Sequence, residues 1–228
     1  MKCDKKNMLL YAVTDRAWVG KQTLCEQVEA ALKGGCTCVQ LREKELSDAD
    51  FFEEAVKIHE ICKHYGVPFI VNDNVDIAVK CHAEGIHVGQ DDMKASCVRE
   101  RVGDDMIIGV SAHTVEEAET DEEKATVEEA VEAVKNGADY LGAGAVFGSS
   151  TKQNAGAMKK ETLRSICEAV DIPVVAIGGI NGKNLKELSH TGIDGVALVS
   201  AIFAADDIEN TCRALRNLKG EEGNAKWK

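Results

Sequence analysis

No apolar run in this 228-residue sequence approaches the ~18 consecutive residues that a membrane-spanning helix needs. The first 13 residues, MKCDKKNMLLYAV, also lack the profile of a secretory signal peptide. Positive charge is scarce, because 27 Lys and Arg residues stand against 39 Asp and Glu, for a net charge of −12. We therefore expect a cytoplasmic protein that binds neither membranes nor nucleic acid. The sequence gives no indication of its oligomeric state.

Two motifs that would indicate other protein classes are also missing. No Gly-x-Gly-x-x-Gly motif follows the first predicted strand, which argues against a dinucleotide-binding fold. The nine cysteines are scattered and odd in number, and Cys36 and Cys38 share one face of a predicted strand rather than forming a zinc knuckle. We interpret the cysteines as reduced, mostly buried thiols.

The acidic residues are concentrated in one segment. Residues 116–132 contain nine Asp and Glu against Lys124 alone. The segment carries a near-repeat, TVEEAE at 114–119 and TVEEAVEA at 126–133. We interpret it as a solvated helix face that lengthens the outside of the fold and does not reach the functional site.

Apolar strand-like segments alternate with helical segments along the whole chain. Eight such units in this length predict a single-domain α/β fold, a (β/α)8 TIM barrel over residues 1–219, followed by a polar tail at 220–228. A doubly wound open sheet is the alternative. Asn181 is expected to cap the helix between the last two strands. The expected strands are 9–15, 37–44, 69–71, 86–88, 106–110, 139–143, 173–179 and 195–200.

Two neighbouring predicted strands are each followed by a carboxylate. Asp73 comes after the third strand and Asp92 after the fourth, at the edge of the sheet where parallel α/β folds place their chemistry. With Asn72 and Gln90 beside them, the two carboxylates suit a hard cation such as Mg²⁺ that holds a phosphate. The alternative is that Asp73 and Asp91 or Asp92 cap the helices that follow. The basic residues nearby favour the metal site.

Polar residues alternate along the predicted strand at 37–44. Gln40, Arg42 and Lys44 therefore share one face, and near the carboxyl end of a barrel strand that face opens to the site. Together with Lys152 and a bound metal ion, Arg42 and Lys44 supply enough positive charge for a pyrophosphate.

A second phosphate site is indicated at the last two strands. Gly178 and Gly179 follow the seventh strand and Ser200 follows the eighth, which matches the usual phosphate site of barrels, built from backbone N–H groups and a helix N-terminus. The two glycines could instead form a tight turn. One phosphate and one pyrophosphate suggest a transfer reaction in which pyrophosphate leaves.

Eight further segments extend from near the start of the chain to the last strand. They are YAVTDR (11–16), VQLREK (39–44), VNDNVDIA (71–78), GIHVGQDD (85–92), GVSAHT (109–114), GADYLGAGAVFGSSTK (137–152), AIGGI (176–180) and GVALVSAI (195–202). Together they resemble the thiamine phosphate synthase family, in the family's order and over nearly the whole chain. The resemblance implies a transferase that joins hydroxymethylpyrimidine diphosphate to hydroxyethylthiazole phosphate with Mg²⁺, giving thiamine phosphate and pyrophosphate. It also implies a dissociative mechanism, in which pyrophosphate leaves before the thiazole nitrogen captures the pyrimidine cation.

The resemblance assigns a role to each matching residue. Mg²⁺ would be bound by Asp73 and Asp92. Arg42, Lys44 and Lys152 would act in catalysis, by stabilising charge on the leaving pyrophosphate. The pyrimidine diphosphate would be held by Gln40, Arg42, Lys44, Asn72, Ser111 and Lys152. The thiazole phosphate would be held by Ser149, Ser150, Thr151, Gly179, Val199 and Ser200.

One loop departs from the family pattern. Where the family usually has Pro-Thr-x-Thr-Lys, this chain has Gly148-Ser149-Ser150-Thr151-Lys152. Glycine in place of proline should make the loop more mobile, so Gly148→Pro is expected to tighten substrate binding.

Two histidines stand close to the predicted site. We interpret His87 and His113 as hydrogen-bonded structural residues rather than general bases. A thiazole tautomerase of the same superfamily, which would use a histidine and no metal, is one alternative function. A non-catalytic sensor of phosphorylated ligands is another. The predicted diphosphate–metal site favours the transferase, because neither alternative needs one.

Overall fold

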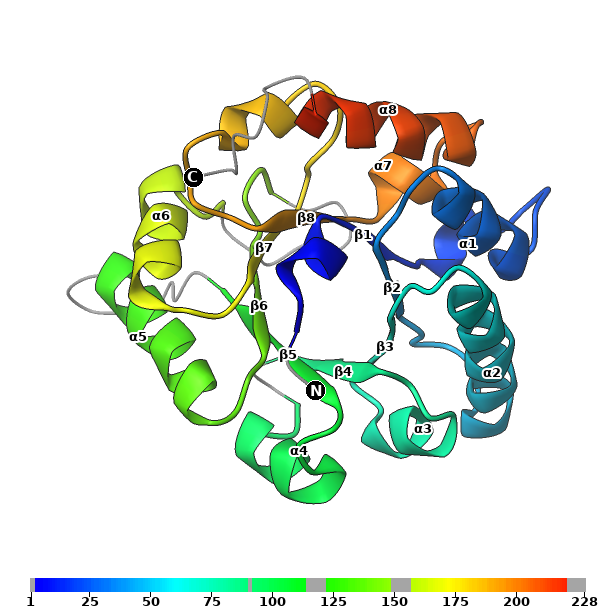
Figure 1. Ribbon diagram of the computed structural model, residues 1–228, viewed down its shortest axis with the longest axis horizontal. Coiled ribbons are helices and arrows are strands. Elements are labelled where there is room, and N and C mark those ends of the chain that lie inside the picture. The colour runs from blue at the N-terminus through cyan, green and yellow to red at the C-terminus, as the bar shows by residue number, and fades with distance from the viewer. Residues whose placement is uncertain (1–2, 90–91, 114–121, 149–156, 221–228) are drawn as a thin grey trace.

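The computed structural model describes residues 3–89, 92–113, 122–148 and 157–220. Eight parallel strands close into a barrel in the order β1 to β8, with helices around the outside (Figure 1). This confirms the predicted (β/α)8 barrel and rules out the open sheet. Across the described ranges, no helix has the length and apolar character that crossing a membrane requires.

The strands are short, and the helices that connect them vary in length. The strands are β1 (Leu10–Val13), β2 (Cys38–Leu41), β3 (Phe69–Asn72), β4 (Gly85–Val88), β5 (Ile107–Ala112), β6 (Tyr140–Gly144), β7 (Val174–Ile177) and β8 (Gly195–Leu198). The α-helices are α1 (Leu24–Lys33), α2 (Asp48–His64), α3 (Val75–Lys80), α4 (Ala95–Val102), α5 (Glu122–Lys135), α6 (Lys160–Ala169), α7 (Ser200–Phe203) and α8 (Ile208–Gly220). Short 3-10 helices are η1 (Lys5–Met8), η2 (Arg16–Trp18) and η3 (Leu185–Leu188).

The connection between β7 and β8 differs from the prediction. Asn181 does not cap an α-helix, since the element that follows is the single 3-10 turn η3. The Asn181 side chain instead accepts a hydrogen bond from the backbone N–H of Lys183 (2.9 Å) and donates one to the carbonyl of Gly179 (3.1 Å). Asn181 therefore closes a turn directly after the glycine pair of β7.

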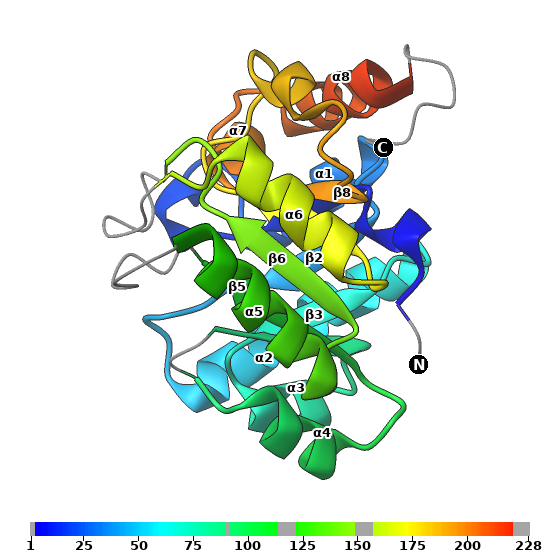
Figure 2. The ribbon, with the colours of Figure 1, turned by 90° about the vertical axis from the view of Figure 1, so that its left-hand side faces the viewer.

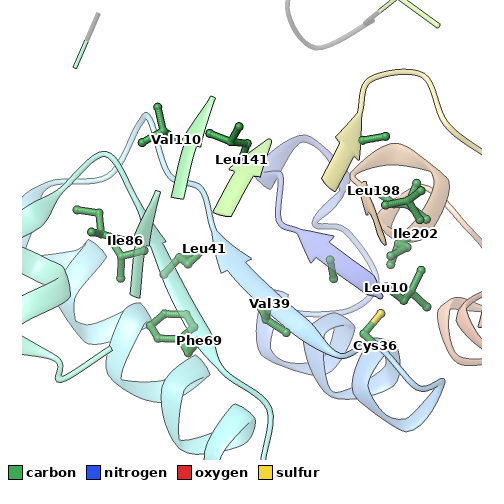
Figure 3. Packing of buried hydrophobic residues seen from close by; sticks show 14 of the residues in the cluster. Leu10, Cys36, Val39, Leu41, Phe69, Ile86, Val110, Leu141, Leu198 and Ile202 are labelled. Atoms are coloured by element: carbon green, nitrogen blue, oxygen red, sulfur yellow. The ribbon is translucent and has the colours of Figure 1, made fainter. Parts of the chain in front are cut away.

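Side chains of each strand alternate between two apolar layers, as the two-residue period of a strand requires. In β2, Val39 and Leu41 pack outward among the helices, where Figure 3 shows them with Phe69 and Ile86. The smaller inner layer fills the barrel and includes Tyr11, Ile70, Tyr140 and Val175. Met8 of η1 joins this inner layer, so η1 closes the amino-terminal end of the barrel (Figure 1).

Side chains at the amino-terminal edge tie the strands together in pairs. The residue directly before each even-numbered strand accepts a hydrogen bond from the first or second N–H of the preceding odd-numbered strand. Each bond satisfies a backbone donor that would otherwise lie unpaired at the start of a strand. The pairs are Thr37 with Leu10 (2.9 Å), Glu84 with Phe69 (2.9 Å), Asp139 with Ile108 (2.9 Å) and Asp194 with Val174 (3.1 Å).

The acidic near-repeat is not confined to the outer surface. Its first copy, 114–119, falls in a part of the chain that the structure does not describe. Its second copy lies in α5, which packs beside α6 over β6 (Figure 2). There Thr126 and Ala130, four residues apart, are fully buried against the barrel, whereas Glu128 is exposed. The prediction that this segment only lengthens the outside was therefore wrong for the second copy.

The cysteines are free thiols, as expected. Five of the nine are buried, among them Cys36 and Cys212, and Cys97 is exposed. Of the polar tail predicted for 220–228, Gly220 is the last residue of α8. Residues 221–228 lie outside the described residues.

Candidate functional site

A pocket opens at the carboxyl ends of the strands, and its two sides differ in character. The side formed by β2 to β5 carries most of the polar side chains: Gln40, Arg42, Asn72, His87, Ser111 and His113. The side formed by β6 to β8 and β1 consists mainly of glycine and aliphatic residues: Val13, Gly142, Gly144, Val175, Ile177, Gly178, Gly179, Val199 and Ser200. Of the predicted site residues in described ranges, seven line the pocket: Gln40, Arg42, Asn72, Ser111, Gly179, Val199 and Ser200. Lys44, Asp73 and Asp92 do not line it and lie in the loops after β2, β3 and β4.

Arg42 and Lys44 follow β2 in a loop that buried contacts hold in place. The backbone N–H of Arg42 donates to the Thr14 hydroxyl (3.0 Å). The Glu43 carboxylate, 2 % exposed, accepts from the backbone N–H of Lys44 (2.8 Å) and from the guanidinium of Arg16 (2.7 Å). Arg16 and Glu43 therefore fix the two bases relative to the pocket.

Glu43 is a residue whose role the sequence did not reveal. Burial opposes its ionisation, but the backbone N–H donors and the Arg16 guanidinium outweigh burial and hold the pKa of Glu43 below its usual range. The signal was present in the alternation at 37–44, because Glu43 is the charged residue on the face opposite to Gln40, Arg42 and Lys44. A charged side chain on a buried face needs hydrogen-bond or ion-pair partners, which would have predicted a partner for Glu43.

Asp73 sits at the end of β3 in a left-handed backbone conformation, with φ of 61°. This conformation costs about 1 kcal/mol for a non-glycine residue and is concentrated at functional sites. It turns the carboxylate to the Lys44 ammonium, with which it forms an ion pair, and to the Asp92 carboxyl. Burial, reinforced by contact with Asp92, raises the pKa of Asp73 even though Lys44 opposes the rise.

Neither Asp73 nor Asp92 caps a helix, so the alternative interpretation of these residues as helix caps was wrong for both. Asn74 caps α3 by accepting from the N–H of Ile77 (3.0 Å). At α4 the N-cap position is Lys94, which makes no side-chain cap. Asp92 instead accepts from the backbone N–H of Gly89 (2.8 Å). Asp91 and Gln90 lie outside the described residues.

Two carboxylates in contact fit a bound divalent cation. Like charges at this separation repel, and a cation between hard oxygen ligands turns that repulsion into attraction. No group of three or more His, Cys, Asp or Glu side chains in the described ranges forms a metal site. Two carboxylates are nonetheless the usual protein share for Mg²⁺, which takes its other ligands from phosphate and water. Asp73 and Asp92 therefore fit the metal that the resemblance implies.

Backbone approaches closely at the two glycines after β7. Gly178 and Gly179 have φ of 100° and 63°. A Cβ on Gly178 would lie 2.5 Å from the Cβ of Ala145, and one on Gly179 would lie 2.7 Å from the carbonyl oxygen of Gly148. The pair is thus both a tight turn and an exposed backbone wall of the pocket, which also includes Val199 and Ser200.

The loop after β6 corrects one expectation. Gly148 has φ of 75°, whereas the proline ring holds φ near −65°. Proline cannot adopt this conformation, so the expectation that Gly148→Pro would tighten binding was wrong. Ser149, Ser150, Thr151 and Lys152 lie outside the described residues.

A chain of hydrogen bonds crosses the barrel beneath the pocket. The Gln40 amide donates to the Tyr11 hydroxyl, which contacts the Tyr140 hydroxyl, and each bond is 2.9 Å long. Tyr140 contacts Nδ1 of His87, and Nε2 of His87 contacts the Ser111 hydroxyl, again at 2.9 Å. Both ring nitrogens of His87 are therefore in hydrogen-bond contact, as predicted.

The sequence did not reveal that Tyr11 and Tyr140 belong to this hydrogen-bond chain, although both stand at inward positions of apolar strands. His113 lines the pocket mouth, and its backbone N–H donates to Glu129 of α5 (3.3 Å).

Fold and pocket together define a TIM-barrel enzyme that acts at the carboxyl edge of its strands, with charged groups on one side and exposed backbone on the other. Comparison with known proteins identifies the class further. A family model described as thiamine monophosphate synthase matches residues 10–202.

Individual relatives agree with that match. A thiamine-phosphate synthase of Ruminiclostridium cellulolyticum is 47% identical over 92% of this chain and 95% of its own length. One of Clostridium acetobutylicum is 46% identical, over 90% and 92%. The structure of a thiamine phosphate pyrophosphorylase from Pyrococcus furiosus superposes with a TM-score of 0.84 at 37% identity, covering 95% of this chain and 98% of that one. The chain belongs to the thiamine monophosphate synthase family, and it is a transferase.

Proposed function

We propose that this protein joins hydroxymethylpyrimidine diphosphate to hydroxyethylthiazole phosphate, with Mg²⁺, and releases pyrophosphate. The observation that carries the proposal is the asymmetry of the pocket. Arg42 lines one side, next to the loops after β2, β3 and β4 that carry Lys44, Asp73 and Asp92, and the Gly178–Gly179 backbone lines the other. A diphosphate with its metal suits the first side, and a monophosphate held by N–H groups suits the second.

On the charged side, Arg42 binds phosphate oxygens in a bidentate manner, and Lys44 adds a point charge. Their support from Thr14 and Glu43 keeps both in position before substrate arrives, which is what electrostatic catalysis requires. Asp73 and Asp92 would hold Mg²⁺, which would supply positive charge beside the leaving pyrophosphate. Lys44, which forms an ion pair with Asp73 in the structure, would contact the substrate once Asp73 holds the metal.

The apolar side serves a different purpose. Val13, Val175 and Ile177 give the pocket an aliphatic lining. In a dissociative reaction the pyrimidine methylene becomes a cation, and the thiazole nitrogen must reach it before water does. A dry wall of aliphatic side chains favours that outcome. No covalent intermediate with the protein is needed.

The proposal is tested by a coupled assay for pyrophosphate release. We expect release only when both substrates and Mg²⁺ are present, and thiamine phosphate as the matching product. A metal-independent isomerisation of a thiazole substrate, without pyrophosphate, would instead support the tautomerase. Tight binding of one phosphorylated ligand without any turnover would support the sensor.

A further inference from the structure

The hydrogen-bond chain from Gln40 to Ser111 is a polar element in the otherwise apolar interior of the barrel. Tyr11 and Tyr140 are 1% and 0% exposed, and Gln40 and His87 are nearly as deeply buried. Five different strands contribute its members. Burial raises the pKa of both phenols well above its usual range, so both hydroxyl groups stay neutral and each has one hydrogen to donate.

The direction of donation along the chain is constrained at one end. The amide nitrogen of Gln40 faces Tyr11 and can only donate, so the Tyr11 oxygen accepts. If the Tyr11 hydroxyl donates to the Tyr140 oxygen, the Tyr140 hydroxyl donates to Nδ1 of His87. In the opposite arrangement Tyr140 would donate to Tyr11, and the Tyr11 hydroxyl would have to donate to the thiol sulfur of Cys38, which is a weak acceptor. A buried donor with a weak acceptor costs free energy, so the first arrangement is favoured.

The remaining step follows from imidazole chemistry. A neutral imidazole whose Nδ1 accepts must carry its hydrogen on Nε2. Nε2–H then donates to the Ser111 oxygen, 2.9 Å away. The hydroxyl hydrogen of Ser111 therefore points away from His87, and Ser111 can donate it to another group.

We propose that Tyr11, Tyr140 and His87 are positioning residues that fix the hydrogen-bond polarity of the pocket floor. Gln40 then presents its carbonyl oxygen as an acceptor, and Ser111 presents its hydroxyl as a donor. A planar nitrogen heterocycle with an amino group and a ring-nitrogen acceptor on its edge matches this pattern. The proposal rests on the proposed function, since it concerns the heterocycle of the diphosphate substrate.

Glycine makes room for the central tyrosine of the chain. A Cβ on Gly109 would lie 2.1 to 2.4 Å from ring atoms and the hydroxyl of Tyr140. The ring of Tyr140 also contacts those of Tyr11 and His87, with centroids 6.0 and 5.5 Å away. Because packing fixes the ring, Tyr140→Phe removes the hydroxyl and leaves the shape of the interior unchanged.

The first test reads the polarity directly and needs no activity. Nitrogen NMR of the ¹⁵N-histidine-labelled wild-type protein at neutral pH distinguishes the two tautomers of His87. We expect hydrogen on Nε2, and loss of that preference in Tyr140→Phe. Hydrogen on Nδ1 in the wild-type protein would overturn the proposal, whatever reaction the protein catalyses.

The second test is kinetic and uses a matched control. We expect Tyr140→Phe and Tyr11→Phe to raise KM for the pyrimidine diphosphate roughly tenfold, the equivalent of one misdirected hydrogen bond, and to leave KM for the thiazole phosphate unchanged. Tyr65→Phe removes a hydroxyl that donates to Glu29 outside the barrel (3.3 Å) and should change neither. An equal rise for both substrates would overturn the proposal.

Rescue at His87 separates positioning from general stability. The amide nitrogen of His87→Gln reaches about as far as Nε2 and can donate to Ser111, whereas that of His87→Asn stops near Nδ1. We expect the Gln variant to keep KM within about threefold of wild type and the Asn variant to match Tyr140→Phe. If both variants behave alike, or if Asn is the better substitute, His87 does not act through Ser111.

Discussion

Removing one carboxylate of the Asp73–Asp92 pair should stabilise the protein when metal is absent. Asp92→Asn is the appropriate change, because its amide oxygen can still accept from the N–H of Gly89 as Asp92 does. Two carboxylates about 4 Å apart repel by roughly 1 to 4 kcal/mol at effective dielectric constants between 80 and 20. Lys44 and solvent reduce this, since the Asp73 side chain is 23% exposed. About 1 kcal/mol remains.

The assay is thermal unfolding with and without Mg²⁺. In EDTA we expect the Tm of Asp92→Asn to exceed that of wild type by about 2 to 4 °C, as 1 kcal/mol gives in a chain of this size. At Mg²⁺ ten times its Kd, wild type should gain about 1.4 kcal/mol and the variant nothing, so the order of Tm is reversed. Asp171→Asn, an exposed acid before β7, serves as control and should change neither value.

The pH dependence follows from the raised pKa of Asp73. A carboxyl whose pKa is higher in the folded than in the unfolded protein destabilises the fold above its folded pKa. That destabilisation is relieved as the pH falls through the folded pKa. The Tm difference between variant and wild type should thus be full at neutral pH and shrink in acid. An Asp92→Asn variant that is less stable than wild type in EDTA, or that still responds to Mg²⁺, would refute the metal assignment.

Three further predictions concern other parts of the molecule. Lys44→Ala should weaken binding of the pyrimidine diphosphate at least tenfold more than that of the thiazole phosphate, and equal losses by calorimetry would mean that the two phosphate sites are misplaced. Gly148→Pro should raise KM severalfold while Gly148→Ala has a smaller effect, because φ of 75° excludes proline outright; steady-state kinetics that show a lower KM for the proline variant would contradict the conformation of this loop. Cys97 should react with a thiol reagent before the other eight cysteines, as mass spectrometry of the partly labelled protein can verify, since it is the exposed one.

The sequence predicted the barrel and the neighbourhood of the site because both depend on local periodicity. Once β3 and β4 were recognised as parallel neighbours, Asp73 and Asp92 had to meet at one edge, and the structure brings them into contact. The same logic placed Lys44 near them, and it forms an ion pair with Asp73. Contacts of this kind follow from strand order alone.

What the sequence did not reveal depends on distance or on backbone angles. Tyr11 and Tyr140 meet across 129 residues, and nothing local to either indicates its partner. In α5 the surrounding acids concealed the four-residue spacing of Thr126 and Ala130, which is the signal of a buried helix face. The φ of Gly148 depends on the loop around it, and no residue type prescribes it.

The side-chain anchors at the amino-terminal edge divide the barrel into four equal modules of two strands each. Every anchor joins residues of a single module, so a chain divided between α4 and β5 keeps two complete anchors in each part. A division between β5 and β6 would separate Asp139 from Ile108. If the chain is expressed as two fragments divided between residues 103 and 104, we expect each half to form enough structure to associate with the other. The salt bridge between Arg99 and Asp139 would then be a contact between the two halves. The pocket, in contrast, draws on all four modules and exists only when they are assembled.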